Sequence, residues 1–103
     1  MTAQAIFNHL TTNLSLSHQG ESGQMFGKQC IKVAGKAAVA LFKDNLVFKL
    51  PAIEVQQALL LEGSELWDPS GKGRAMKEWV QIPIDHEDKF SRLATLAADY
   101  VSP

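Results

Sequence analysis

Cysteine is almost absent from this sequence, since Cys30 is the one cysteine among 103 residues. A single thiol forms no intrachain disulfide, which favours a reducing compartment, and we expect the cytoplasm. The sequence also lacks any apolar run near the roughly 18 residues that a membrane-spanning helix needs, so we expect no membrane partner. Residues 1–7 have no basic residue ahead of an apolar stretch, and are not typical of a signal peptide.

An excess of charge of either sign is also lacking. The chain has 10 Lys and Arg residues against 11 Asp and Glu, which gives a formal net charge of −1. This balance provides no overall field to gather nucleic acid, so any attraction to phosphate must come from a local cluster. With 46% apolar and 20% charged residues, the composition is that of one ordinary globular domain, and we expect residues 1–103 to form a single unit.

Residue sets for catalysis or metal binding are lacking as well. Cys30 is tied to no His or Asp by a motif, although flanking lysines on its strand face could lower its thiol pKa. His9, His18 and His86 do not lie at a metal-ligand spacing from another His, Cys or carboxylate. We therefore expect no enzyme, no cofactor and no metal ion.

Hydrophobic periodicity predicts three helices. Apolar residues recur at helical spacing over residues 3–16, and a polar, glycine-bearing loop is expected over residues 17–23. A second helix is predicted over residues 53–62, ended by Gly63. Asp85 is expected to cap a last helix, which carries an apolar stripe up to Val101.

Five strands are predicted between these helices. Short runs separated by turns predict an antiparallel meander, followed by two strands after the second helix. The predicted strands cover residues 25–33, 37–42, 46–50, 65–67 and 76–82. The order α-β(3)-α-β(2)-α predicts an α+β fold of two layers, a five-stranded antiparallel sheet with helices on one face. The expected core residues are Leu10, Leu14, Ile31, Val39, Leu41, Phe48, Leu59, Phe90, Leu93 and Ala97.

The segment Gly71-Lys72-Gly73-Arg74 is the one candidate for an anion cradle. Glycines let backbone N–H groups point at an anion, and Lys and Arg add positive charge. The phosphate-binding loop of nucleotide hydrolases, however, needs four residues between its glycines and a following helix, whereas this segment leads into a predicted strand. A solvated turn is the simpler interpretation.

Lys72, Arg74 and Lys77 form the densest basic cluster of the chain, and Trp79 follows closely. Strand alternation puts Trp79 on the same, more polar face as Lys77, so we expect an exposed aromatic anchor beside positive charge. The alternative is that Trp67 or a loop covers Trp79.

Several motifs between residues 25 and 83 resemble the N-terminal domain of the TfoX/Sxy family of competence regulators. They are Met25-Phe26-Gly27, Gly35-Lys36, Lys49-Leu50-Pro51, Trp67-Asp68-Pro69 and the run Gly-Lys-Gly-Arg-Ala-Met-Lys-Glu-Trp-Val at residues 71–80. The resemblance implies a fold similar to the secretion-chaperone-like class, with no established catalytic residues. The full-length regulators carry a second, helical domain, so the resemblance implies a stand-alone member here.

We interpret the chain as a non-catalytic interaction module with a protein partner. Two alternatives stay open: a regulator that binds nucleic acid through a local basic patch, and an enzyme that uses the glycine segment to hold a small anionic substrate. The sequence also leaves a homodimer open. The predicted partner-binding residues are Lys28, Trp67, Lys72, Gly73, Arg74, Lys77 and Trp79.

Overall fold

The first helix is confirmed by the structure, a computed structural model that describes all residues 1–103. Helix α1 (Ala3–His18) begins after Thr2, whose hydroxyl accepts a 3.1 Å hydrogen bond from a backbone N–H of the first turn. It ends at Gln19, whose left-handed backbone (φ 56°) cannot continue a helix. The observed helix extends slightly beyond the predicted residues 3–16.

Helix α2 (Ala52–Ala58) is shorter than the prediction over residues 53–62. After Ala58 the chain tightens into turns that bond each N–H to the carbonyl three residues earlier, and these turns do not extend a helix. Leu59 therefore lies outside the helix and is 37% exposed, so its assignment to the core was wrong.

The last helix, α3 (Phe90–Val101), is confirmed, but its predicted cap was wrong. A 3₁₀-helix, η1 (Ile84–Lys89), precedes it and begins after Pro83. Asp85 lies in the first turn of η1 and makes no capping hydrogen bond. The proline sets φ for the start of η1, and the non-helical backbone of His86 produces a kink within η1.

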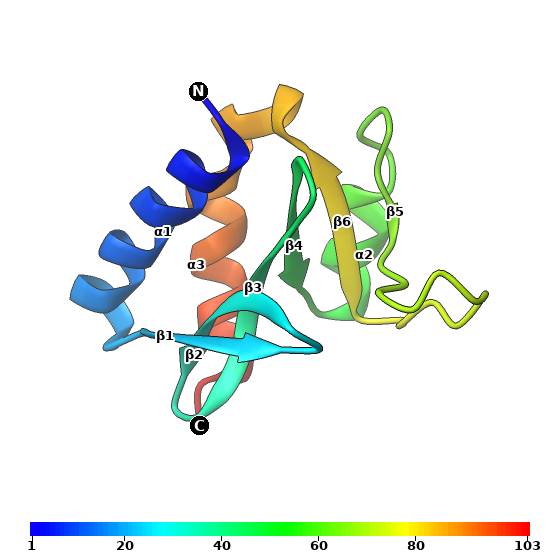
Figure 1. Cartoon of the computed structure of the whole chain (residues 1–103). Coiled ribbons are helices and arrows are strands. Elements are labelled where there is room, and N and C mark those ends of the chain that lie inside the picture. Colours follow the sequence, from blue (N-terminus) through cyan, green and yellow to red (C-terminus); the bar gives the residue numbers. More distant parts are fainter.

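The strands form one antiparallel sheet with the order β1-β2-β3-β4-β6-β5 (Figure 1). They are β1 (Glu21–Met25), β2 (Lys28–Val33), β3 (Lys36–Phe42), β4 (Asn45–Lys49), β5 (Glu65–Leu66) and β6 (Trp79–Pro83). The antiparallel α+β class is thus confirmed, with six strands in place of five. The strand predicted over residues 76–82 begins only at Trp79.

The additional strand is β1, at one edge of the sheet. Its residues fall partly within residues 17–23, which were predicted to be a loop, and Met25 was assigned to the following strand. The sequence Glu-Ser-Gly-Gln-Met shows no alternation of apolar and polar residues, and none of these residues is buried in the structure. Pairing with β2 across the tight turn at Phe26–Gly27 is what makes this segment a strand.

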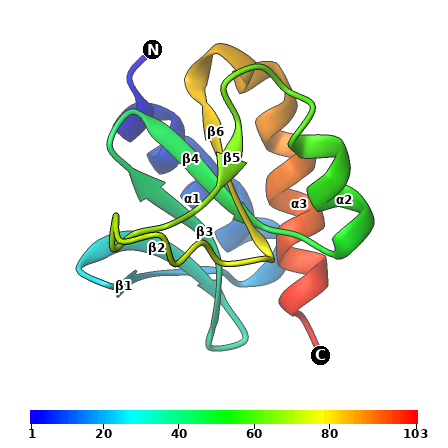
Figure 2. The ribbon, with the colours of Figure 1, turned by 90° about the vertical axis from the view of Figure 1, so that its right-hand side faces the viewer.

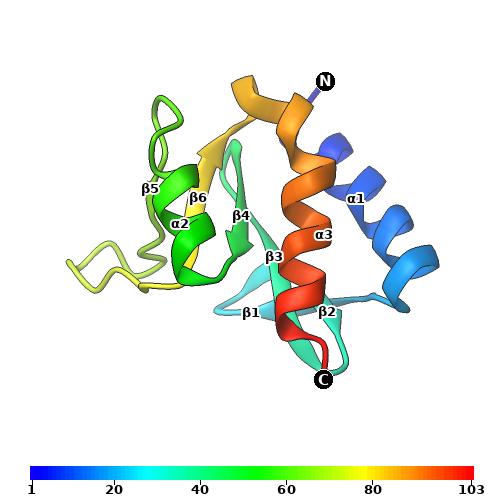
Figure 3. The same ribbon diagram turned by 180° about the vertical axis from the view of Figure 1, so that it is seen from behind.

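Helices α1, α2 and α3 lie on one face of the sheet, where the main core is found (Figures 1 and 3). Alternate strand residues point to this face, among them Ile31, Phe48 and Val80. The intervening residues point to the opposite face, which no helix covers. Of the expected core, the buried members are Leu10, Leu14, Ile31, Val39, Phe48, Phe90, Leu93 and Ala97, whereas Leu41 is half-buried.

Candidate binding surface on the helix-free face of the sheet

A second, smaller core occupies the helix-free face. Cys30, Ala40 and Val47 contribute short side chains from three neighbouring strands, and Trp67 and Trp79 cover them. Trp67 has no exposed surface, and the two indole rings meet edge to face at 5.5 Å between centroids. This cluster holds the long β5–β6 connection against the sheet.

The prediction that Trp79 is an exposed anchor was therefore wrong, and the alternative that Trp67 covers it is confirmed. Trp79 is 6% exposed and does point away from the helices, as strand alternation indicated. The connection between β5 and β6 folds back over it, because the N–H of Trp67 donates to the carbonyl of Trp79 over 2.9 Å. Both tryptophans are buried beneath the loop, so they support its exposed residues and offer almost no surface to a partner.

The Asp68 carboxylate organises the loop that follows Trp67. It accepts five hydrogen bonds of 2.6 to 3.1 Å: from the hydroxyl and N–H of Ser70 and from the N–H groups of Gly71, Gly73 and Arg74. The Ser70 hydroxyl and these backbone donors lower the pKa of Asp68 to about 2. Sequence reasoning missed this residue, although an Asp before Pro and a Ser-Gly pair is a signal for a turn of this kind.

The glycine segment is consequently not an open anion cradle. The backbone N–H groups of Gly71 and Gly73, which were predicted to be available, already donate to Asp68, and that of Lys72 donates to the Ser70 hydroxyl. Both glycines have positive φ, 70° and 80°, which is the conformation that turns these donors inward. A carboxylate of the chain itself thus fills the position where an anionic substrate would bind.

Phe26 is the exposed aromatic residue of this face. It lies at the tip of the β1–β2 hairpin with φ 53°, a conformation that is strained for a bulky side chain, and is 62% exposed. Its ring meets that of Trp67 edge-on at 6.2 Å between centroids. In Figure 2 the β5–β6 connection runs across the sheet toward this hairpin tip.

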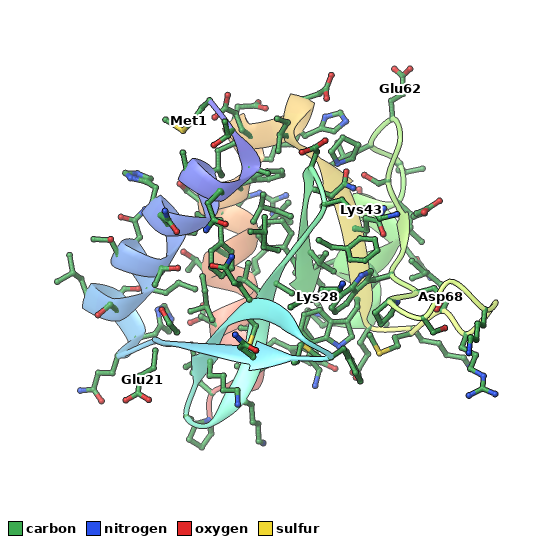
Figure 4. The ribbon with its side chains drawn as sticks, in the orientation of Figure 1. Met1, Glu21, Lys28, Lys43, Glu62 and Asp68 are labelled. Atoms are coloured by element: carbon green, nitrogen blue, oxygen red, sulfur yellow. The ribbon has the colours of Figure 1, made fainter.

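Several cations that form no ion pair share this face with Phe26, and Arg74 lines the same hollow as its ring. Lys72, Arg74 and Lys77 are exposed on the loop, and the chain's three ion pairs involve none of them. Lys28 of β2 and Lys43 of the β3–β4 turn lie on the same side as Asp68 (Figure 4). We call Phe26, Lys28, Lys43 and residues 68–77 the loop face.

Two hollows lie on either side of the loop segment Asp68–Ser70, which lines both. The Phe26 hollow, about 310 Å³, is formed by Phe26, Pro69 and Met76, with Arg74 at its side. The lysine hollow, about 480 Å³, contains the side chains of both Lys28 and Lys43. Sequence reasoning placed Lys28 and Arg74 in one site but missed Phe26 and Lys43, which only hairpin geometry brings here.

The largest hollow of the molecule, about 700 Å³, lies elsewhere, between α1 and the β1–β2 hairpin. Its lining is mostly uncharged and polar, and Cys30 is its one titratable residue. Burial raises the pKa of the Cys30 thiol and outweighs the charge of Lys32, which acts to lower it. A buried, protonated thiol is a poor nucleophile, and this hollow offers no reactive group.

Metal-ligand geometry and membrane-spanning helices are both absent from the structure. No three His, Cys, Asp or Glu side chains gather as a ligand set would. None of the helices combines the length and apolar character of a membrane span.

Comparison with known proteins adds no relative. No protein-family model matches the chain, and neither the curated proteins nor the solved structures contain a match. The resemblance to the TfoX/Sxy N-terminal domain and to the secretion-chaperone-like class stays a prediction. The loop face is therefore interpreted from its own geometry.

Proposed function

We propose that this protein is a non-catalytic binding domain that holds an acidic segment of a partner protein on its loop face. The observation that carries the proposal is the exposed Phe26 ring, which contacts buried Trp67 and shares a hollow with Arg74, a cation that forms no ion pair within the chain. An aromatic anchor on a rigid base, beside Arg, is the arrangement found at the energetic centres of protein interfaces.

The site residues support binding better than catalysis. The enzyme alternative relied on open backbone donors in the glycine segment, and Asp68 occupies these donors. Nucleic acid is the second candidate, because Phe26 could stack on a base and the cations could contact phosphates. The formal net charge of −1 and the presence of a single exposed ring on this face favour a protein.

The family assignment belongs to the same proposal. We infer a relative of the TfoX/Sxy N-terminal domain, acting as a regulatory module in the cytoplasm, from the motifs between residues 25 and 83. Some of these motifs contribute to the loop face: Phe26 lies at the hairpin tip, and residues 68–77 belong to the connection that covers the second core. The motifs at residues 35–36 and 49–51 lie outside the loop face. A homodimer is left open by this proposal.

Selection of peptides on immobilised protein tests the proposed function. The selected peptides should combine a large apolar residue with acidic residues. Phe26→Ala and Arg74→Ala should each lower the affinity for these peptides by about fivefold or more, which corresponds to the loss of about 1 kcal/mol that marks an interface contact. Leu60→Ala is the matched control for Phe26→Ala, because Leu60 is another exposed apolar side chain, 79% exposed, and follows helix α2, which lies on the opposite side of the sheet from the loop face (Figure 3).

Two results would contradict the proposal. One is a set of peptides without acidic residues, or peptides that bind Phe26→Ala and Leu60→Ala equally well. The other is tight binding of a single-stranded oligonucleotide that weakens by orders of magnitude between about 50 and 200 mM salt, which would assign the loop face to nucleic acid.

A further inference from the structure

Lys28 and Lys43 converge on one aromatic ring. The Lys28 ammonium lies 5.6 Å from the centroid of the Phe42 ring, and the Lys43 ammonium lies 5.2 Å from it. Phe42 itself packs edge-on against Trp67 at 5.8 Å, so the buried second core fixes its position. The ring attracts both cations electrostatically, and both lysines line the same hollow beside it.

Neither ammonium has an anionic partner in the structure. The three ion pairs of the chain join His18 to Asp99, Lys89 to Asp88, and Arg92 to Glu54. Two carboxylates, those of Glu65 and Asp68, do line the lysine hollow. The Asp68 carboxylate, however, is already engaged by five donors of its own loop.

The formal charges of the hollow sum to zero, but its two ammonium groups form no ion pair. Lys28 and Lys43 contribute two positive charges, and Glu65 and Asp68 contribute two negative charges, of which that of Asp68 is held by the donors of its own loop. A carboxylate carries one negative charge, whereas a phosphoryl group carries about −1.5 to −2 and would be repelled more strongly by Glu65 and Asp68.

We propose that the lysine hollow binds one carboxylate of the partner segment, an Asp or Glu side chain held between the ammonium groups of Lys28 and Lys43. The inference rests on the proposed function, in that the same acidic segment would occupy both hollows across Asp68–Ser70, which lines each of them. An apolar side chain enters the Phe26 hollow, and the acidic side chain enters the lysine hollow. Glu65 acts as a charge filter that disfavours more highly charged groups.

The test is a titration of isotope-labelled protein followed by NMR, with three blocked tripeptides as probes. Acetyl-Gly-Glu-Gly-amide should shift the backbone signals of Lys28, Phe42 and Lys43 and saturate, and the matched Gln peptide should not. A phosphoserine peptide should bind more weakly than the Glu peptide, because Glu65 disfavours its larger negative charge.

Charge-neutralising variants assign the effect to the hollow. Lys28→Gln and Lys43→Gln should each weaken the Glu peptide by about two- to fivefold, the range expected for partly solvated ion pairs, and Glu65→Gln should strengthen it by a similar factor. Lys36→Gln is the control, because Lys36 is exposed at the opposite end of β3 from Phe42, about 20 Å away at about 3.3 Å per residue. It should leave the affinity unchanged.

The outcomes separate this inference from the proposed function. The carboxylate site would be overturned if Lys28→Gln, Lys43→Gln and Lys36→Gln bound the Glu peptide with equal affinity, or if the NMR shifts never saturated. This would hold even if Phe26→Ala still failed to bind the selected peptides. A phosphoserine peptide that binds far more tightly through Lys28 and Lys43 would overturn the choice of a carboxylate. The inference would be supported by saturable binding of the Glu peptide whose affinity changes only in the Lys28, Lys43 and Glu65 variants. This result would stand even if the Phe26 hollow bound no apolar side chain.

Discussion

Trp79→Ala should destabilise the fold strongly, whereas Arg74→Ala, a short distance away in the same segment, should leave it nearly unchanged. Trp79 is 6% exposed and packs on Trp67 at 5.5 Å between ring centroids. Truncation of a buried Trp to Ala removes its transfer free energy and leaves a cavity, which together cost about 3–5 kcal/mol. A domain of this size has a free energy of unfolding of only about 5–15 kcal/mol. Arg74 is exposed and makes no ion pair, so its truncation should change stability by less than about 0.5 kcal/mol.

Urea denaturation followed by far-UV circular dichroism and by the fluorescence of the remaining Trp67 measures both variants. With slopes of about 1–3 kcal/mol per molar urea, Trp79→Ala should lower the midpoint by at least about 1 M at an unchanged slope. Trp79→Phe is the control, because it keeps an aromatic ring against Trp67 and should lose less. Wild-type midpoints for Trp79→Ala would show that Trp79 is not part of the second core, and the description of the loop face would be wrong.

Three further predictions concern single side chains. Asp68→Asn should speed amide exchange at Gly73, because an amide NH₂ donor replaces one of the carboxylate oxygens that accept hydrogen bonds. In the wild type, the pKa of the Asp68 carboxyl is about 2, below the ordinary 3.8. The carboxylate should therefore hold the loop fully above about pH 4 and release it as the pH falls through about 2. A carboxyl signal of Asp68 that titrates near its ordinary pKa would contradict this. Cys30 should react slowly with a thiol reagent in the native state and fast in urea, since burial hides the thiol and raises its pKa; equal rates would show an accessible thiol. Phe48→Ala, in the main core with no exposed surface, should cost about 3–5 kcal/mol in the same urea assay, and an unmoved midpoint would exclude it from the core.

Local sequence patterns were sufficient to predict the helices and strands whose apolar residues recur with the period of that structure. The apolar spacing of Leu10 and Leu14, and that of Phe90 and Leu93, predicted α1 and α3, because a helix repeats the same face about every 3.6 residues. Alternation in β4 and β6 likewise predicted which side chains face the helices. These predictions needed no knowledge of the rest of the chain.

The edge strand β1 and the end of the second helix could not be predicted from local patterns, because contacts with other parts of the chain decide their structure. The residues of β1 show no alternation of their own and pair only because the Phe26–Gly27 turn brings them beside β2. The last residues of the predicted second helix, including Leu59, have good helical composition but leave the helix before Gly63. Gly63 has a positive φ of 83°, and a Cβ at this position would lie 2.9 Å from the Pro83 ring, so only glycine fits there.

The sequence by itself determined that this protein is one α+β unit with a basic cluster at residues 72–77, because composition and periodicity are local properties. Only the tertiary structure decided what that cluster adjoins. A fold-back of the chain buries Trp79 under Trp67 and leaves Phe26 as the exposed ring. Pairing of β2 with β3 brings Lys28 beside Phe42, and Lys43 follows Phe42 in the β3–β4 turn. Contacts between distant segments depend on which strands pair and at what register.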